Sequence, residues 1–472
     1  MDITPSEHFT PVSLSSIYNC HRDELPDNHP IPEMIIGKSG INEFRGIPFD
    51  IGPEDGPNVC LLETETISLD LAGQKASYIL FLHAVANETV TALPELPAPA
   101  EPGTSFGGLV SDYTIEYEDG ESVAHSINRR FAIQQYNNDW GSSAMAAIPA
   151  CKEGSYRSNS EDSILGTIPK SPGVAECRNV SARDSSNQPR AYIYAMPNPH
   201  PDKPLKSLKI SPSESSVIYG ISLTQLVEHP LRFQQRRKLI LTLPEGHEFN
   251  AIGELDDIEF DLGNVISARQ QLLYKDWTAD PVDVQPDRSA NTVLIEYATH
   301  PAAKLYLKTG DGQKSYDLLN LNEAMLDVSP AHRPVKIRVI DKDSRVAVGV
   351  RIHFHGEAGE YLPPKGNHRK VNDNWFMDNY GEFANGANDY AYIHGECILD
   401  APLGTVYVEI TRGYEIAPLR ESFTVDADTN EICFELERVL DWRNRGWVTA
   451  DTHVHFLSPA TAVLEGEGED VN

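Results

Sequence analysis

The sequence predicts a mainly β, multidomain protein that runs into the beginning of an α/β unit. As far as about residue 440, apolar and polar residues alternate in short stretches, which is the period of half-buried strands. Turn-forming residues separate these stretches, and a strand-like segment followed by a clear helix start occurs near residue 450. At 472 residues the chain has room for three or four domains. We expect domains at residues 1–230, 231–332, 333–441 and 442–472.

The composition limits the classes of partner. The formal net charge of −31 argues against binding to nucleic acids and to anionic membrane surfaces. No run of about 18 apolar residues exists, which argues against a membrane span. The N-terminus lacks the basic and apolar regions of a signal peptide and favours a cytoplasmic location. A small-molecule or glycan substrate remains as the expected partner, and no oligomeric state is indicated.

Residues 1–230 read as β throughout. The run from Tyr78 to Val85 is continuously apolar, as in a buried strand. Alternating residues around Ile115 and Ile127 flank the pair Asp119-Gly120, which predicts a β-hairpin. Residues 152–190 are rich in Ser, Asn, Gly and Pro, so we expect a surface insertion there.

Four stretches of this first domain resemble a galactose-binding-type jelly roll. They are Phe44-Arg45-Gly46-Ile47-Pro48-Phe49, Ile79 to His83, the Tyr-Glu-Asp-Gly hairpin and Asn198-Pro199-His200-Pro201-Asp202-Lys203. Such domains are often attached to carbohydrate-processing enzymes, so the resemblance implies glycan binding, with Trp140 and several tyrosines as stacking platforms. The alternative is a structural domain whose aromatic residues form the core.

Residues 231–332 predict a small β-rich domain of unnamed fold. Strands are expected at Leu239 to Leu243, around Phe260 and around Leu305, and a short helix at Ala268 to Trp277.

Residues 333–441 predict a β-sandwich, because alternating runs recur at short spacing with turn signals between them. The pattern resembles the transthyretin-like module of carboxypeptidase regulatory domains, in which Pro402-Leu403-Gly404 would be the turn before a strand. Within it, Gly356 to Asp389 is a long loop rich in aromatic residues, which favours an ordered docking loop over a disordered one. His353 and His355 share a strand face with Arg351, and we expect that face to be solvated.

The strongest candidate site is Asp451-Thr452-His453-Val454-His455. The stretch from Gly446 to Phe456 reads as a strand, which would point Asp451, His453 and His455 to one face. Neutral imidazole is a common ligand of zinc and similar metals, and the carboxylate can bind the metal or orient a histidine ring. The spacing therefore predicts a metal site, in preference to core or surface histidines.

A helix is expected directly after this strand. Ser458-Pro459 combines an N-cap residue with proline at the first helical position, and Ala460 to Glu469 can form about three turns. A strand followed by a helix looks like the opening of an α/β domain that continues beyond this sequence. The scattered cysteines form no C-x-x-C pair, and neither a Walker loop nor a G-x-S-x-G elbow is present.

The order of these features, a transthyretin-like module ending in Leu436-Glu437-Arg438, then Gly446-Trp447 and the motif, resembles the CehA/McbA branch of the PHP metallohydrolases. The resemblance implies a distorted (β/α)₇ barrel that binds two or three divalent metals such as zinc, manganese or iron. It implies hydrolysis of phosphoesters or of amide or carbamate-like bonds. His453 and His455 would be the first two metal ligands and Asp451 a ligand or their partner. Phe456-Leu457-Ser458 after the second histidine departs from the commonest pattern of these enzymes.

On this interpretation the sequence is the N-terminal part of a hydrolase, and these 472 residues alone are inactive and bind metal weakly. A catalytic zinc site needs three protein ligands, and the acidic residues after His455 lie on or beyond the expected helix. The loop from Gly356 to Asp389 would pack against the metal domain, or fold back on its own sandwich where that domain is missing. The competing class is a carbohydrate-binding or scaffold protein without catalytic activity.

Overall fold

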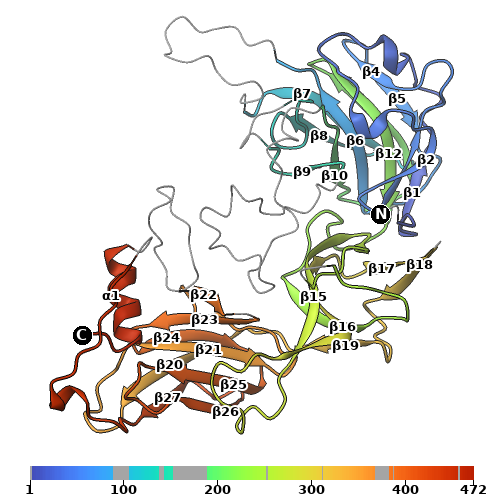
Figure 1. Ribbon diagram of the computed structural model, residues 1–472. Helices are drawn as coiled ribbons and strands as arrows, with labels where there is room; N and C mark the ends of the chain where they lie inside the picture. Colours follow the sequence, from blue (N-terminus) through green and yellow to red (C-terminus); the bar gives the residue numbers. More distant parts are fainter. Residues whose placement is uncertain are drawn as a thin grey trace, which may run out of the picture.

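The computed structural model describes residues 3–88, 106–137, 143–151, 189–250, 253–310, 312–366, 382–385, 387–454 and 458–472. Within these ranges the chain is mainly β and forms seven separate sheets. The sheets group into three β-rich units that follow one another in space in chain order, as Figure 1 shows. None of the helices in the described ranges has the length and apolar character needed to cross a bilayer.

The first unit is built from two packed antiparallel sheets and a hairpin. One sheet has the order β1-β12-β6-β10-β9, with β4 also paired to β12, and the other has the order β5-β11-β7-β8. The strands are β1 (Phe9–Val12), β4 (Cys60–Leu62), β5 (Ile67–Asp70), β6 (Tyr78–Val85), β7 (Leu109–Tyr117), β8 (Ser122–Asn128), β9 (Ala147–Pro149), β10 (Tyr192–Pro197), β11 (Leu205–Pro212) and β12 (Ser216–Thr224). The hairpin joins β2 (Gly40–Phe44) to β3 (Ile47–Ile51), and two 3-10 turns, η1 (Arg22–Glu24) and η2 (Glu33–Ile35), precede it. The predicted strand at Tyr78–Val85 and the predicted hairpin, now β7 and β8, are confirmed.

The central strand β6 is buried on both faces. Leu80 and Leu82 point into one apolar cluster, whereas Ile79 and Phe81 point into the cluster between the two sheets. This explains why β6 is apolar throughout instead of alternating, since each face of the pleat meets a different core. The predicted insertion at 152–190 lies almost wholly outside the described residues.

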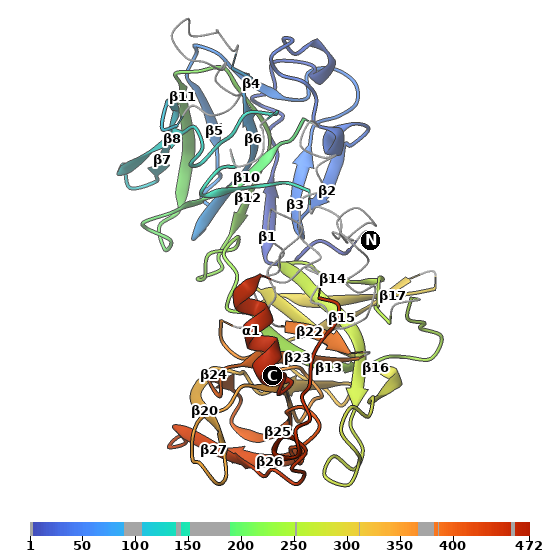
Figure 2. The ribbon, with the colours of Figure 1, turned by 60° about the vertical axis from the view of Figure 1, so that its left-hand side comes forward.

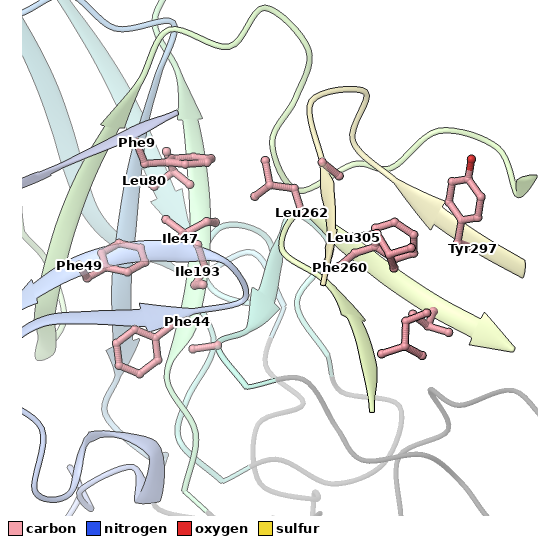
Figure 3. Packing of buried hydrophobic residues seen from close by; sticks show 14 of the residues in the cluster. Phe9, Phe44, Ile47, Phe49, Leu80, Ile193, Phe260, Leu262, Tyr297 and Leu305 are labelled. Carbon is pink, nitrogen blue, oxygen red and sulfur yellow. The ribbon is translucent and has the colours of Figure 1, made fainter. Parts of the chain in front are cut away.

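The first of those clusters continues into the middle unit. Phe44 and Ile47 of the β2–β3 hairpin belong to the same cluster as Phe260 and Leu305 of the middle unit (Figure 3). Gly46, at the tip of the hairpin, has a φ of 80°, and a Cβ there would lie 2.4 Å from the carbonyl oxygen of Asp261. Glycine therefore serves twice at this position, for the turn and for the close approach of the two units.

The middle unit contains two sheets, with the orders β15-β16-β13-β19 and β14-β17-β18. Its strands are β13 (Arg237–Thr242), β14 (Ile258–Phe260), β15 (Gly263–Leu273), β16 (Asp287–Thr299), β17 (Lys304–Thr309), β18 (Gly312–Asp317) and β19 (Met325–Val328). The helix predicted at Ala268 to Trp277 is wrong, because these residues continue β15 to Leu273 and then leave the sheet. The long strand β16 pairs with β15 as far as Leu273, with two irregularities in the register, and this pairing overrides the local helical preference.

The third unit is a sandwich of two sheets, with the orders β24-β20-β27 and β22-β23-β21-β25-β26. Its strands are β20 (Arg333–Asp341), β21 (Val350–Gly356), β22 (Glu382–Asn385), β23 (Asn388–Ile393), β24 (Glu396–Ala401), β25 (Gly404–Thr411), β26 (Leu419–Val425) and β27 (Glu431–Leu436). The alternating residues of β20, β21 and β25 meet in one apolar core, as their period of two predicts. The predicted turn at Pro402-Leu403-Gly404 leads directly into β25.

The chain then passes through the 3-10 turn η5 (Arg443–Arg445) to the helix α1 (Pro459–Gly468). The helix packs against β21 and β23 of the third unit and is drawn in red in Figure 2. Ser458 caps it by accepting a hydrogen bond from the amide of Thr461, and Pro459 occupies the first turn. The predicted helix is therefore confirmed.

Candidate functional site

The segment that precedes α1 carries the predicted metal ligands, but it is not a strand. After η5 the chain turns at Gly446, whose φ is 85°, and residues 447–454 run without regular structure. The prediction of a strand from Gly446 to Phe456 is thus wrong over 446–454. A parallel strand needs a neighbour for its hydrogen bonds. Within the described ranges the sheets offer no such neighbour here.

Asp451 and His453 are brought together by a local turn. The backbone amide of His453 donates a hydrogen bond to Oδ1 of Asp451 at 2.9 Å, and both residues are exposed. His455, the remaining predicted ligand, lies outside the described residues. Asp451 and His453 offer oxygen and nitrogen donors of the kinds that zinc, manganese and iron accept. The described ranges contain no cluster of three or more His, Cys, Asp or Glu able to hold a metal, so the described donors do not complete a site.

The backbone just before the motif is held firmly by the residues that follow α1. The amide of Thr449 donates to Oδ1 of Asn472 at 2.9 Å, and the amide of Asn472 donates back to the carbonyl of Thr449 at 3.1 Å. The hydroxyl of Thr449 donates to the carbonyl of Asp470 at 2.8 Å. Asp451 therefore follows, by two residues, a point fixed to the third unit.

Asp470 itself is the centre of a buried ionic network. Its carboxylate is only 5% exposed and lies 2.8 Å from Arg412, 3.1 Å from Arg438 and 3.2 Å from Arg443. Arg438 also pairs with Glu415, whose carboxylate accepts a hydrogen bond from the amide of Arg443 at 3.2 Å. Asp470, which follows the motif in the chain, is thus a structural residue of this network.

The acidic residues of α1 and its end bind the third unit as well. Glu467 lies 2.8 Å from Nδ1 of His394, and Glu469 accepts a hydrogen bond from Tyr392 at 2.7 Å. A Cβ on Gly468 would lie 2.4 Å from the ring of Tyr392, so this glycine lets the helix end approach the sheet closely. These contacts commit Glu467 and Glu469 to the third unit.

A cleft of about 340 Å³ lies beside the motif, and sequence analysis did not identify it. Its walls are mainly apolar and include Trp442 and Trp447, whose rings are perpendicular with centres 6.0 Å apart. Thr449 lines the same cleft and precedes Asp451 by two residues, so the cleft lies close to the motif along the chain. Exposed tryptophans in a linker, 45% and 65% exposed here, are the signal that could have pointed to it.

The second His-x-His pair is buried, which corrects the expectation of a solvated face. His353 and His355 on β21 are 1% and 2% exposed. Nδ1 of His353 lies 2.6 Å from the carbonyl oxygen of Asp389, so it must carry the proton and donate. Nε2 of His353 then accepts from Nδ1 of His355 at 3.1 Å. Two imidazoles that satisfy each other in this way form a neutral buried pair.

Aromatic residues from distant parts of the chain enclose the pair. The ring of Tyr274 stacks on His355 at 3.8 Å, and Tyr407 stacks on it at 4.8 Å. Trp277 stands perpendicular to the same ring at 4.4 Å. Tyr274 and Trp277 come from the connection between β15 and β16 in the middle unit, and this is why alternation within β21 could not predict the burial of its histidine face.

Burial shapes the acid–base properties of this cluster. It lowers the pKa of His353 to about 4 and holds the pKa of His355 well below its ordinary value of 6.5. Burial also raises the pKa of Glu409, which accepts a hydrogen bond from Tyr390 at 2.9 Å and pairs with Arg420 at 2.8 Å. Both histidines are thus neutral near pH 7.

The aromatic residues proposed to stack on sugars are largely internal. Tyr113, Tyr117, Tyr136, Tyr192 and Tyr219 of the first unit are at most 1% exposed. Trp140 lies outside the described residues. These five tyrosines therefore act as core residues, for example through the 3.0 Å hydrogen bond between the hydroxyls of Tyr136 and Tyr219.

The described start of the loop from Gly356 to Asp389 folds back on its own sandwich. Tyr361 bridges to His355 on β21, Leu362 is 1% exposed, and Pro364 bridges to Leu399 on β24. Trp375, Phe376 and Tyr380 lie outside the described residues, so docking of this loop on a metal domain remains a prediction.

No protein-family model matches the sequence, and no curated protein matches it. Among solved structures, the pilus 2b backbone protein of group B streptococcus matches 81% of this chain and 92% of its own, at 9% identity and a TM-score of 0.18. The pilus backbone RrgB from Streptococcus pneumoniae matches 78% of this chain and 91% of its own, at 10% identity and a TM-score of 0.17. Likenesses at this level carry no inference about fold or function.

Proposed function

We propose that this sequence is the N-terminal part of a metal-dependent hydrolase of PHP type, in which residues 442–472 begin the catalytic domain. Asp451, His453 and His455 would contribute its first metal ligands, and the bond hydrolysed would be a phosphoester, an amide or a carbamate-like bond. The observation that carries the proposal is the placement of Asp451 and His453 on an exposed segment. Its start is fixed at Thr449 by Asp470 and Asn472.

The neighbouring cleft supports the same proposal. Ligand sites are usually concave and mainly apolar, with a few polar groups, and occupy about 300–1,000 Å³. The cleft at Trp442 and Trp447 has a volume of about 340 Å³ and is lined by Thr449, two residues before Asp451. A bound divalent ion, whether zinc, manganese or iron, would supply Lewis acidity. The remaining ligands would come from outside the described residues.

Metal binding by the 472-residue chain tests the role of the motif. We expect weak zinc or manganese binding in calorimetric titrations, because two or three ligands from one open segment form an incomplete site. Binding should disappear in the double variant His453→Ala, His455→Ala. It should persist in the control His332→Ala, since His332 is an exposed residue at the start of the third unit. Equal binding by all three proteins would remove the motif as the ligand source.

Hydrolysis is tested separately with phosphodiester and amide substrates. The 472-residue chain should show no turnover, whereas a longer chain that carries further βα units should show turnover that depends on His453. Turnover by the 472-residue chain, together with tightly held stoichiometric metal, would contradict the expectation of an incomplete site. It would require the missing ligands to come from upstream or from a second chain.

The finer fold assignments belong to the same proposal. We take the first unit to be a galactose-binding-like jelly roll and the third to be a transthyretin-like module of the carboxypeptidase-regulatory type. Both assignments are supported by the apolar core that lies between the two sheets of each unit. A cytoplasmic location is part of the proposal too, and fractionation of cells that express the protein would test it.

The second candidate is a non-catalytic scaffold. It is favoured by the apolar cluster that runs without interruption from Phe49 in the first unit to Phe260 in the middle unit. Such a core suits a rigid spacer. Glycan binding has less support, because five of the described tyrosines of the first unit are buried. A glycan array probed with the 472-residue chain tests it, and no signal across the array would remove carbohydrate binding.

A further inference from the structure

The connection between β15 and β16, which we call the arm (residues 274–286), belongs to the middle unit but lies on the third. Figure 1 shows it in yellow-green beside β25 and β26. Trp277 donates its indole N–H to the carbonyl of Glu421 at 3.0 Å, and Tyr274 donates its hydroxyl to Oδ1 of Asn388 at 2.9 Å. Arg420 donates to the carbonyl of Pro281 at 2.8 Å. The arm is thus fastened to β23 and β26 of the third unit.

Two further contacts hold the arm against the third unit. Arg351 on β21 binds the carboxylate of Asp283 in the arm at 2.9 and 3.1 Å. A Cβ on Gly359, whose φ is 80°, would lie 2.2 Å from the carbonyl oxygen of Leu272 at the root of the arm. The two units therefore meet at backbone distance, and the meeting point lies beside the buried histidine pair.

The arm covers the two histidines unequally. His355 lies directly beneath Tyr274 and against Trp277, at ring distances of 3.8 and 4.4 Å. The same two arm rings are farther from His353, at 6.0 and 5.9 Å, and Tyr361 and Tyr390 of its own unit lie at 5.8 and 5.5 Å. Lifting the arm would consequently bring water to His355 first.

The groups around the pair decide whether it can accept a proton. The ionisable residues that pack around it come from β21, the turn after it, β23, β25, β26 and the arm; they are Arg351, Glu360, Tyr361, Asp389, Tyr390, Tyr407, Glu409, Arg420, Tyr274 and Asp283. Arg420 is the cation that disfavours a second positive charge near His355. The carboxylate of Glu409 is committed to Arg420 and to Tyr390. A protonated His355 would thus lie between aromatic faces beside a fixed cation.

We propose that this contact is a pH-sensitive latch between the middle and third units, closed at neutral pH over the neutral histidine pair and opened more often in mildly acidic solution, where the open state takes up a proton on His355.

The direction of the effect follows from linkage. In the closed state burial, His353 and Arg420 hold the pKa of His355 well below 6.5, whereas an exposed histidine keeps about 6.5. Below pH 6.5 the open state therefore binds the additional proton, and acid favours opening. Glu409 and Glu360 act in the opposite direction, because burial raises each pKa above the ordinary 4.5 in the closed state. Opening of the arm should thus be studied above pH 5. In this range protonation of the histidine already favours the open state, and the opposing effect of the two carboxyl groups is still small.

Hydrogen exchange of the arm amides, corrected for the intrinsic pH dependence, tests the latch in the full chain. Linkage to one site with an open-state pKa of about 6.5 predicts about tenfold faster exchange at pH 5.5 than at pH 7.5. The variant His355→Phe keeps a ring between Tyr274 and Tyr407 but cannot titrate, so its arm should show no comparable rise. The control His332→Phe changes an exposed histidine and should behave like the wild-type chain.

Amides of β20 and β25 serve as the internal reference. They should stay protected at both pH values, which separates release of the arm from unfolding of the third unit. If His355→Phe loses this protection, His355→Gln takes its place. Arm exchange that does not change with pH, a rise of the same size in the non-titrating variant, or simultaneous opening of β20 and β25 would each overturn the latch.

Discussion

The guanidinium group of Arg420 lies 3.8 Å from the centre of the Trp277 ring, in a contact that joins strand β26 of the third unit to the arm of the middle unit. Trp277 is 5% exposed and the side chain of Arg420 is equally buried. Cation–aromatic contacts contribute about 2 kcal/mol when they are shielded from water. The pair therefore adds specific attraction to the apolar burial of the indole.

We expect Trp277→Ala to destabilise the third unit and its contact with the middle unit by about 3–5 kcal/mol, the usual cost of removing a buried tryptophan. Urea unfolding followed by circular dichroism would measure the change. Trp447→Ala is the matched control, because Trp447 is 65% exposed, and its cost should stay within about 0.5 kcal/mol. Similar losses in both variants would mean that the arm contributes little.

The ion pair between Glu409 and Arg420 gives a second prediction. Arg420→Met leaves a buried carboxylate without its partner, and we expect a loss of about 3–5 kcal/mol. The double variant Glu409→Gln, Arg420→Met should lose less than the sum of the two single variants, since the second change removes the unpaired charge. A double-mutant cycle in urea would measure this coupling, and strictly additive losses would argue against a direct interaction.

A third prediction concerns the junction of the first and middle units. Gly46→Ala places a methyl group 2.4 Å from the carbonyl oxygen of Asp261 at a φ of 80°, so we expect a cost of about 2–4 kcal/mol from strain and overpacking. Gly56→Ala is the control, because Gly56 has a φ of 78° with no atom within 4 Å of the added Cβ, and it should cost only about 1 kcal/mol. Thermal unfolding would measure both, and equal costs would mean that the close approach relaxes freely.

The fourth prediction is a loss of stability in mild acid, led by His83 in the first unit. Its Nε2 donates to the carbonyl of Ala132 at 3.0 Å, its Nδ1 accepts from Tyr113 at 3.2 Å, and burial lowers its pKa to about 4. The unfolded chain takes up this proton below pH 6.5 and the folded chain does not. Stability is therefore complete above pH 6.5 and falls by up to about 3 kcal/mol as the pH drops towards 4.

Urea midpoints at pH 7.5 and pH 5.0 would reveal this dependence. The variant His83→Gln removes the titration, so its midpoint should change less between the two pH values than that of the wild-type chain, even if its stability is lower at both. An unchanged pH dependence in the variant would assign the acid sensitivity to other groups, such as His29, whose pKa burial also lowers to about 4.

Strands were predictable where the residue pattern within one strand indicates which of its faces are buried. Tyr78–Val85 and the β7–β8 hairpin follow directly from apolar runs, alternation and the turn residues Asp119-Gly120. Alternation identifies a second face but not what covers it. His353 and His355 therefore read as solvated, because Tyr274 and Trp277, which enclose them, come from a different unit.

The segment around the candidate metal site shows which features local sequence can predict and which depend on distant residues. The local signals at Ser458 and Pro459 predicted α1 correctly, since capping depends only on neighbouring residues. A strand at 446–454 would have needed hydrogen-bonding neighbours, which no local pattern can supply. The same reasoning explains the wrong helix at Ala268 to Trp277, where pairing with β16 decides the conformation.

The pairing of β1 with β12 has a consequence for biosynthesis. Phe9 lies opposite Thr224, so the first sheet cannot close until nearly half of the chain has left the ribosome. Until then β6 would expose two apolar faces. One of these faces becomes covered only after the residues near Phe260 of the next unit have been synthesised. Such late pairing of distant segments slows folding and prolongs the time during which apolar surface is exposed to solvent. Nascent chains arrested before residue 224 should therefore be the ones that engage chaperones most strongly.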